Sequence, residues 1–133
     1  MELRKFDFQR WPAYEKALLV IGRINDLCGR LERDTSANLR DQLRRASQSI
    51  PLNIAEGSAR YTSRDKANFF RIARGSVFEC VAILDVIRSL ELAKGGFSEM
   101  YTNLEQIARM LSGLINYVES ERYKTVGTKP SVT

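Results

Sequence analysis

The sequence contains no histidine among its 133 residues. Without an imidazole the chain cannot form a Ser-His-Asp triad, a Cys-His dyad or a zinc site that uses histidine. The carboxylate metal sites of helical bundles also need Glu-x-x-His pairs, which are missing here. Four glutamates therefore lack the partners that such a site requires: Glu15, Glu79, Glu105 and Glu119. We predict a protein that holds no metal or cofactor and is not an enzyme.

Cysteine, proline and glycine are scarce, at two, three and eight residues. Two cysteines do not make a disulfide framework, which predicts a reducing, cytoplasmic location. Both Cys28 and Cys80 fall on apolar helical stripes, where a thiol acts as a small hydrophobic group. The low glycine and proline content excludes a collagenous or low-complexity chain.

Long apolar runs are missing as well. No segment approaches the ~18 uninterrupted apolar residues of a membrane span, so we expect no membrane partner. The first ten residues, MELRKFDFQR, carry charges where a signal peptide has its apolar core, so we expect no secretion. A composition of 44% apolar and 28% charged residues is typical of a soluble globular protein.

Apolar residues recur at intervals of three and four along almost every long segment, and no segment alternates as a strand does. Four amphipathic helices with short connections predict an all-α fold, an antiparallel up-down four-helix bundle over residues 11–120. Residues 1–10 are expected to form an N-terminal arm whose Phe6 and Phe8 dock on the bundle. Residues 121–133 have little to bury and are expected to form a flexible tail.

The first two helices have recognisable start signals. Trp11 and Pro12 are expected to begin the first helix, because proline suits the first helical position. The polar residues 33–36 end it, and Thr35 or Ser36 is placed to cap the second helix.

Pro51 lies in the middle of the second helical pattern. It lacks a backbone donor and its ring crowds the carbonyl of Ser47, so we predict a kink there, with a break into two helices as the lesser possibility. Asn53 and Glu56 interrupt the apolar run beside it. We expect them to satisfy backbone groups that the kink releases, the alternative being a polar contact in a subunit interface or ligand site.

The third helix is expected to follow a turn over residues 57–63, since Thr62 opens a capping-box pattern, TSRD. Its two adjacent apolar stripes are wider than a helix needs to face a monomeric core. Either this helix is central in the bundle or its surplus apolar surface meets another subunit. Gly75 is expected to permit close helix packing, and Gly95 and Gly96 to end the helix in a left-handed cap. We assign structural roles to six residues: Trp11, Pro51, Asn53, Glu56, Gly57 and Gly75.

Positive charge is concentrated in one segment. Residues 35–75 carry eight basic and three acidic residues, so this segment alone matches the net charge of +5 of the whole chain. Guanidinium groups bind phosphate bidentately, which favours a nucleic acid as partner. The alternative is a solvated helix face, or one that pairs with acidic groups of a neighbouring subunit. The candidate nucleic-acid-binding residues are Arg40, Arg44, Arg45, Arg60, Arg64, Arg71 and Arg74.

Three segments of the chain resemble a known family. The run QLRRASQSIPLNIAEGSAR, residues 42–60, strongly resembles the signature of bacterial four-helix bundle proteins related to those encoded by intervening sequences in large-subunit ribosomal RNA genes. FDFQRWPAYEKA, residues 6–17, and FFRIARGSVFE, residues 69–79, resemble further blocks of the same family. Two departures are Pro12, where a polar residue is usual, and residues 34–38, which lack an aromatic-glycine turn.

The resemblance implies a four-helix bundle that is a subunit of a ring-shaped homopentamer. A related protein, the accessory variability determinant of diversity-generating retroelements, is a basic pentamer that associates with nucleic acid and a reverse transcriptase. The resemblance therefore directs attention to five of the arginines: Arg40, Arg44, Arg45, Arg60 and Arg64. It implies no catalytic activity.

Two functions compete on these observations. The first is an oligomeric, non-enzymatic protein that binds nucleic acid, structured RNA before DNA, through its arginines. Contact with the phosphate backbone is favoured over base stacking on a single strand, because only Tyr61, Phe69 and Phe70 lie among the arginines. The second is a protein-interaction scaffold whose arginines meet acidic surfaces of a partner or a neighbouring subunit.

Overall fold

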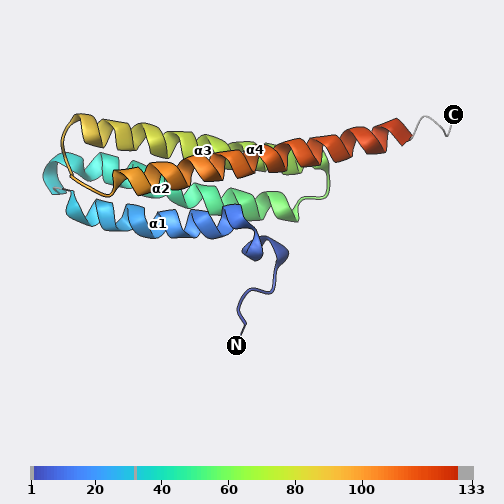
Figure 1. The fold of residues 1–133 in the computed structure, drawn as a ribbon, viewed down its shortest axis with the longest axis horizontal. Coiled ribbons are helices and arrows are strands. Elements are labelled where there is room, and N and C mark those ends of the chain that lie inside the picture. The colour runs from blue at the N-terminus through green and yellow to red at the C-terminus, as the bar shows by residue number, and fades with distance from the viewer. Residues whose placement is uncertain (1, 32, 129–133) are drawn as a thin grey trace.

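The computed structural model describes the backbone of residues 2–31 and 33–128 and the side chains of residues 2–31 and 37–121. Within these residues the chain forms four long α-helices and a short 3-10 helix, and no strand (Figure 1). The predicted all-α, four-helix bundle is confirmed. In chain order the elements are η1 (Asp7–Arg10), α1 (Pro12–Arg30), α2 (Arg33–Ala59), α3 (Ser63–Ser89) and α4 (Phe97–Thr128).

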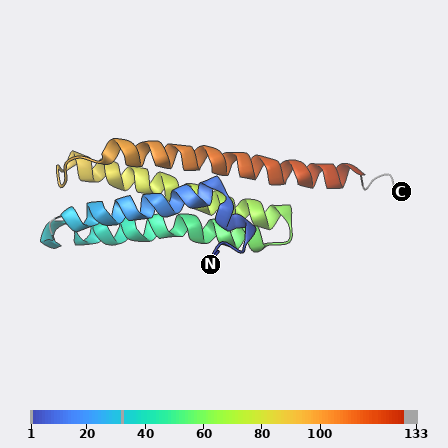
Figure 2. The same ribbon diagram turned by 60° about the horizontal axis from the view of Figure 1, so that its bottom comes forward.

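The helices pack in a closed cycle. Helix α2 packs against α3 and α3 against α4, while α1 packs against both α2 and α4. In the described residues the backbones of α1 and α3, and those of α2 and α4, do not approach each other closely. Helix α4 continues past the end of the other three (Figure 2). None of the described helices combines the length and the apolar character that a membrane span requires.

The core runs along the centre of the bundle and receives side chains from all four helices. Each helix contributes a stripe spaced three and four residues apart, as the sequence predicts, and burying one such aliphatic side chain contributes about 1.5–3 kcal/mol. Both cysteines are buried in it. The largest fully buried side chains are Phe70, Ile24, Leu27, Leu43, Ile50, Ile54, Leu84, Ile87, Met100, Leu104, Ile107 and Leu111.

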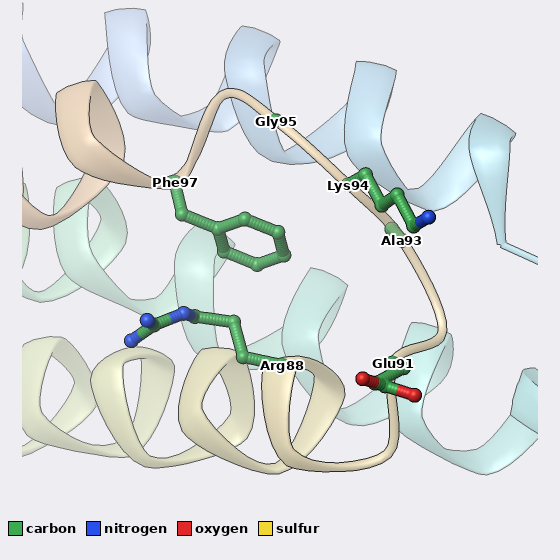
Figure 3. Close-up of a pocket in the computed structure, with 6 residues that line it drawn as sticks. All are labelled: Arg88, Glu91, Ala93, Lys94, Gly95 and Phe97. Atoms are coloured by element: carbon green, nitrogen blue, oxygen red, sulfur yellow. The ribbon is translucent and has the colours of Figure 1, made fainter.

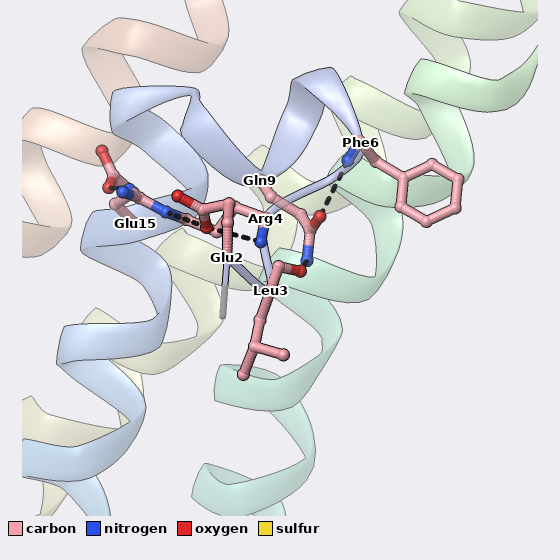
Figure 4. Close-up of polar contacts among 6 residues, drawn as sticks. All are labelled: Glu2, Leu3, Arg4, Phe6, Gln9 and Glu15. Carbon is pink, nitrogen blue, oxygen red and sulfur yellow. Dashed lines mark hydrogen bonds and ion pairs between the residues drawn. The ribbon is translucent and has the colours of Figure 1, made fainter.

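The N-terminal residues fold back on the start of α1. Phe8 packs edge-on against Tyr14, with 5.0 Å between ring centroids, whereas Phe6 stays 67% exposed. Only one of the two phenylalanines expected to dock therefore does so. Figure 4 shows the polar contacts that hold this arm: the Phe6 backbone N–H donates to Gln9 Oε1 (2.9 Å), and Arg4 pairs with Glu15 (3.0 Å). The arm has a defined path although most of it is exposed.

The helix starts agree with the sequence in two of three cases. Helix α1 begins at Pro12 with Trp11 as its N-cap, and Thr62 Oγ1 accepts a hydrogen bond from the Asp65 backbone N–H (3.1 Å) at the start of α3. The predicted cap of α2 at Thr35 or Ser36 is wrong, because α2 already begins at Arg33.

Helix α2 continues through Pro51 as one element to Ala59. The possible break into two helices is therefore wrong, and the kink stays a prediction. The connection to α3 is shorter than the predicted turn over residues 57–63, because Gly57 still lies inside α2 and only residues 60–62 join the helices.

Helix α3 ends earlier than the sequence predicts. Its last residue is Ser89, and Glu91 adopts a left-handed conformation with φ of 54°. The Leu92 N–H donates to the Ile87 carbonyl (3.1 Å) and the Glu91 N–H donates to the Arg88 carbonyl (3.0 Å), which is the pattern of a Schellman cap. A glutamate therefore occupies the position that usually takes glycine.

The predicted closure of α3 at Gly95 and Gly96 is wrong, although both have positive φ, at 81° and 82°. They lie in the connection to α4, which begins at Phe97. Helix α4 then runs to Thr128, beyond residue 120, where the sequence places the end of the bundle. The remainder of the predicted tail, residues 129–133, lies outside the described residues.

The left-handed Glu91 generates a test of stability. A side chain in this conformation costs about 1 kcal/mol that glycine does not incur. We expect Glu91→Gly to raise the free energy of unfolding by roughly 0.5–1 kcal/mol in urea titrations followed by circular dichroism. The control Glu79→Gly, at an exposed position inside α3, should lower it by a similar amount. A loss of stability at Glu91→Gly would contradict this account of the cap.

Candidate nucleic-acid interface

A partly buried polar network joins α2 to α3 near the middle of the bundle. Ser76 on α3 lies 2.8 Å, Oγ to Oγ, from Ser49 on α2. The Asn53 amide donates to the Ser49 carbonyl (2.8 Å) and to the Ser49 hydroxyl (2.9 Å). This corrects the expectation for Asn53, because the carbonyl that Pro51 releases is that of Ser47. Asn53 instead orients the serine that bonds to the neighbouring helix.

Glu56 also departs from its expected role. Its carboxylate lies 3.0 Å from the Arg60 guanidinium, one turn along α2, and the carboxylate is 55% exposed. The side chain therefore faces solvent and holds an arginine, instead of satisfying a backbone group near Pro51. The contact is local, and i,i+4 pairs of this kind contribute about 0.3–0.5 kcal/mol.

Gly57 allows α2 and α3 to approach closely at the end of their hairpin. A Cβ atom built on Gly57 would lie 2.5 Å from the Phe70 ring, which is too close for any side chain. The opposite approach to Phe70 is covered by Trp11, whose ring is edge-on with 6.1 Å between centroids. Gly75 differs, because a Cβ there would meet nothing within 4 Å. No described part of the chain packs closely on Gly75.

Four of the seven candidate arginines are engaged within the chain, and Arg60, Arg71 and Arg74 are three of them. Arg60 pairs with Glu56 and its guanidinium lies 4.5 Å above the Phe69 ring. Arg71 forms an ion pair with Glu119 of α4. Arg74 Nη1 donates to the hydroxyl of Ser112, also on α4 (3.1 Å). Arg71 and Arg74 thus connect α3 to α4.

Arg40 and Arg44 lie on the side of α2 that faces α1. Arg40 Nη1 donates to the Leu31 carbonyl at the end of α1 (3.4 Å), and Arg44 is half-buried. Burial raises the pKa of the Cys28 thiol on α1, and the positive charges of Arg44 and Arg40 oppose that rise only in part. These two arginines are less accessible to a large ligand than their sequence position suggests.

Arg45 and Arg64 are exposed, and neither forms an ion pair or a hydrogen bond with the described residues. Arg64 lies in the first turn of α3, beside the connection to α2. Arg45 lies four helical turns before the end of α2, roughly 20 Å further along the hairpin at 1.5 Å per residue. The seven arginines are therefore spread over the bundle and do not form one patch on a single chain.

Helix α3 also presents apolar side chains to solvent. Ile72, Phe78, Val86 and Leu90 are 50%, 61%, 43% and 60% exposed. Because the α3 backbone lies close to α2 and α4 and to no other described helix, a central position in the bundle does not explain its surplus apolar surface. We call these four residues the α3 apolar face. Exposed Gly75 lies between Ile72 and Phe78 in the sequence.

A second charged cluster, which the sequence analysis missed, lies where α3 connects to α4. Arg88 lies 5.5 Å from the centroid of the Tyr101 ring and 6.0 Å from that of Phe97. The Tyr101 hydroxyl donates to Asp85 (2.6 Å). The pKa of Tyr101 is raised, chiefly by burial and secondly by this hydrogen bond. Figure 3 shows Arg88 beside Phe97 in a depression that Lys94 also lines. The i,i+3 spacing of Asp85 and Arg88 was the available signal.

The cysteines have no reactive setting. Burial, and then the negative charge of Glu79, raises the pKa of Cys80 to about 12, so its thiol stays protonated at neutral pH. The residues that the structure describes contain no group of three cysteine or acidic side chains placed to hold a metal ion.

Comparisons with known proteins identify relatives of this fold. The model of the family described as "23S rRNA-intervening sequence protein" matches residues 9–113. The chain is also similar to the crystal structure of a protein of unknown function from the S23 ribosomal protein family of Bacteroides thetaiotaomicron, with 23% sequence identity and a TM-score of 0.68. That match covers 77% of this chain and 97% of the other. No curated protein matches the chain.

The close approach at Gly57 can be tested by one methyl group. We expect Gly57→Ala to lower the free energy of unfolding by about 1–3 kcal/mol, because the new Cβ must displace the buried Phe70 ring. The matched control is Gly22→Ala on α1, where a Cβ meets nothing within 4 Å and should raise stability by roughly 0.5–1 kcal/mol. Equal effects of the two substitutions in urea unfolding would show that the Phe70 contact does not constrain the hairpin.

Proposed function

This chain belongs to the 23S rRNA-intervening sequence protein family, and we propose that it is a non-enzymatic, cytoplasmic protein that assembles into a ring and binds nucleic acid. The preferred ligand is structured RNA, and the ring has five subunits, as the sequence resemblance implies. A reverse transcriptase, which associates with the related accessory variability determinant, is a candidate protein partner.

The observation that carries this proposal is the pair of uncommitted guanidinium groups at Arg45 and Arg64. Both belong to the segment with eight basic and three acidic residues, and neither forms an ion pair with the residues that the structure describes. An exposed arginine without an acidic partner can exchange its counterions for phosphates, and that release of ions favours binding. A ring presents each arginine once per subunit, which multiplies a contact that is weak in one chain.

The α3 apolar face supports assembly. Large apolar side chains that a helix exposes over several turns are available to a neighbouring subunit, and exposed apolar surface of this kind marks interaction sites. Gly75 adds support, because the absence of a side chain lets a neighbouring backbone come close to α3. In a cyclic ring this face meets a different surface of the next subunit, since ring contacts are head-to-tail.

Binding can be measured by fluorescence anisotropy of labelled structured RNA and duplex DNA between ~50 and 200 mM salt. We expect a steep loss of affinity over that range. Reversing both free arginines, Arg45→Glu with Arg64→Glu, should weaken RNA binding at least tenfold and flatten the salt dependence by about one unit of slope per arginine. The double variant should keep the helical content of the wild type, because neither side chain makes an ion pair or hydrogen bond with the described residues.

The matched control is Arg109→Glu, which changes the charge of an exposed arginine on α4, outside the basic segment. It loses only an exposed pair with Glu105 and should retain wild-type affinity. If Arg109→Glu weakens binding per unit of charge as much as the double variant, general electrostatics and not the α2–α3 arginines explain the attraction. Absence of RNA binding at the lowest salt would overturn the proposed function.

A protein-interaction scaffold is the second candidate, and the α3 apolar face is the observation that favours it. Apolar contacts serve protein surfaces better than phosphate backbones, whose recognition is polar and salt-dependent. Under this function the purified protein ignores RNA, and the partner it retains after nuclease treatment is a protein.

Assembly has its own test. Light scattering of the wild type should give five times the mass of the 15.2 kDa chain. Phe78→Asp should give the mass of a single chain, because a buried, unpaired carboxylate opposes contact through the α3 apolar face. Phe78→Leu keeps an apolar group and should stay assembled. A wild type with the mass of one chain would exclude the ring.

A further inference from the structure

Tyr61 is the most exposed of the large hydrophobic side chains that the structure describes, at 101% of its reference area. It lies in the three-residue connection between α2 and α3. Figure 2 shows this connection at one end of the α2–α3 hairpin. Its hydroxyl makes no hydrogen bond and its ring makes no aromatic contact with the described residues. A small polar residue at this position would therefore serve the fold as well as the Tyr61 side chain does.

The backbone that carries Tyr61 is held firmly on both sides. Thr62 caps α3 by accepting from the Asp65 N–H (3.1 Å), and the Arg60 N–H donates to the Gly57 carbonyl (3.3 Å). Lys66 reaches back from α3 and donates to the carbonyl of Ser58 (3.0 Å), so it closes the end of α2. A flat ring on a fixed turn loses little conformational entropy when a ligand stacks on it.

Two arginines flank this ring in the sequence. Arg60 is oriented by its ion pair with Glu56 (3.0 Å) and by the Phe69 ring, 4.5 Å from its guanidinium, and both contacts favour this position before a ligand binds. Arg64 follows one turn into α3, is exposed and has no ion pair with the described residues. The tip of the hairpin thus combines an unused aromatic face with one fixed and one free cation.

We propose that this turn is a binding site for an unpaired nucleotide, in which a base stacks on Tyr61 while Arg60 and Arg64 contact the phosphates on either side of it. The inference rests on the proposed function and narrows it, because it names single-stranded segments of RNA as the ligand. Aromatic rings bind bases by stacking without regard to sequence, since every base has a π-face. A duplex cannot use the site, because its bases are already stacked on one another.

This site reverses the preference that the sequence suggests between backbone contact and base stacking. Sequence spacing shows one tyrosine among many arginines, which favours backbone contact. The exposure of Tyr61 and its rigid support give stacking a physical basis at this turn. A structured RNA would accordingly be bound at its loops and bulges, with the remaining arginines on the adjoining phosphates.

The test compares a labelled oligouridylate with an RNA duplex of equal length, in fluorescence anisotropy at low salt. We expect Tyr61→Ala to weaken binding of the single strand about tenfold and to change duplex binding by less than twofold. Tyr61→Phe keeps the ring and should restore the affinity for the single strand. Tyr117→Ala, which removes a 64% exposed tyrosine from α4, is the matched control and should leave both affinities unchanged.

Ultraviolet crosslinking provides a second readout. An oligouridylate carrying 5-iodouracil should crosslink to the peptide that contains Tyr61, and mass spectrometry identifies that peptide. Wild-type binding of RNA with no change at Tyr61→Ala and no crosslink at this turn would overturn the inference and leave the proposed function intact. Failure of the wild type to bind either RNA would overturn both. If light scattering shows that Tyr61→Ala no longer assembles, the Tyr61 side chain belongs to a subunit contact, and the inference is also overturned.

Discussion

The close packing of α2 on α3 is the constraint on which the other features of this bundle depend. Gly57 brings the end of α2 against the buried Phe70 ring, and the bond between Ser49 and Ser76 fixes the same two helices further along. Contact at two separate levels sets both the distance and the register of the hairpin. Because the ends of α2 and α3 lie close together, the three residues 60–62 are enough to connect them. The rigid presentation of Tyr61 is a consequence of this packing.

The helices could be predicted from the sequence because their signals are local. Pro12 and Thr62 mark helix starts through their own backbone and side chain, and the three-four spacing of apolar residues marks the buried faces. The end of α3 could not be predicted, because Glu91 is a residue that rarely adopts positive φ. The glycine pair at residues 95–96 is a stronger sequence signal for a helix end than Glu91 is. The hydrogen bonds of the actual cap, made by the N–H groups of Glu91 and Leu92, depend on the path of the chain after the helix.

The partners of Arg71 and Arg74 could not be predicted, because they are distant in the sequence. Arg71 pairs with Glu119 and Arg74 bonds to Ser112, and both partners come from α4. A count of charges over residues 35–75 treats these arginines as equal to Arg45, which has no partner among the described residues. The sequence therefore located the basic segment correctly but could not separate the cations that stabilise the bundle from those that remain for a ligand.

In the proposed ring, cyclic symmetry would repeat the α2–α3 turn once per subunit and so strengthen its binding of RNA. In a cyclic assembly every copy of Tyr61 lies at one height and one radius, so the copies form a circle on one rim. A single stacked base on one isolated chain is a weak contact, because an exposed ring lacks a pocket. A single strand that follows the rim meets the next copy at high effective concentration, and each added contact strengthens binding without new chemistry. On the proposed function a bundle this small would bind RNA at an exposed turn, provided that the α3 apolar face holds the subunits together.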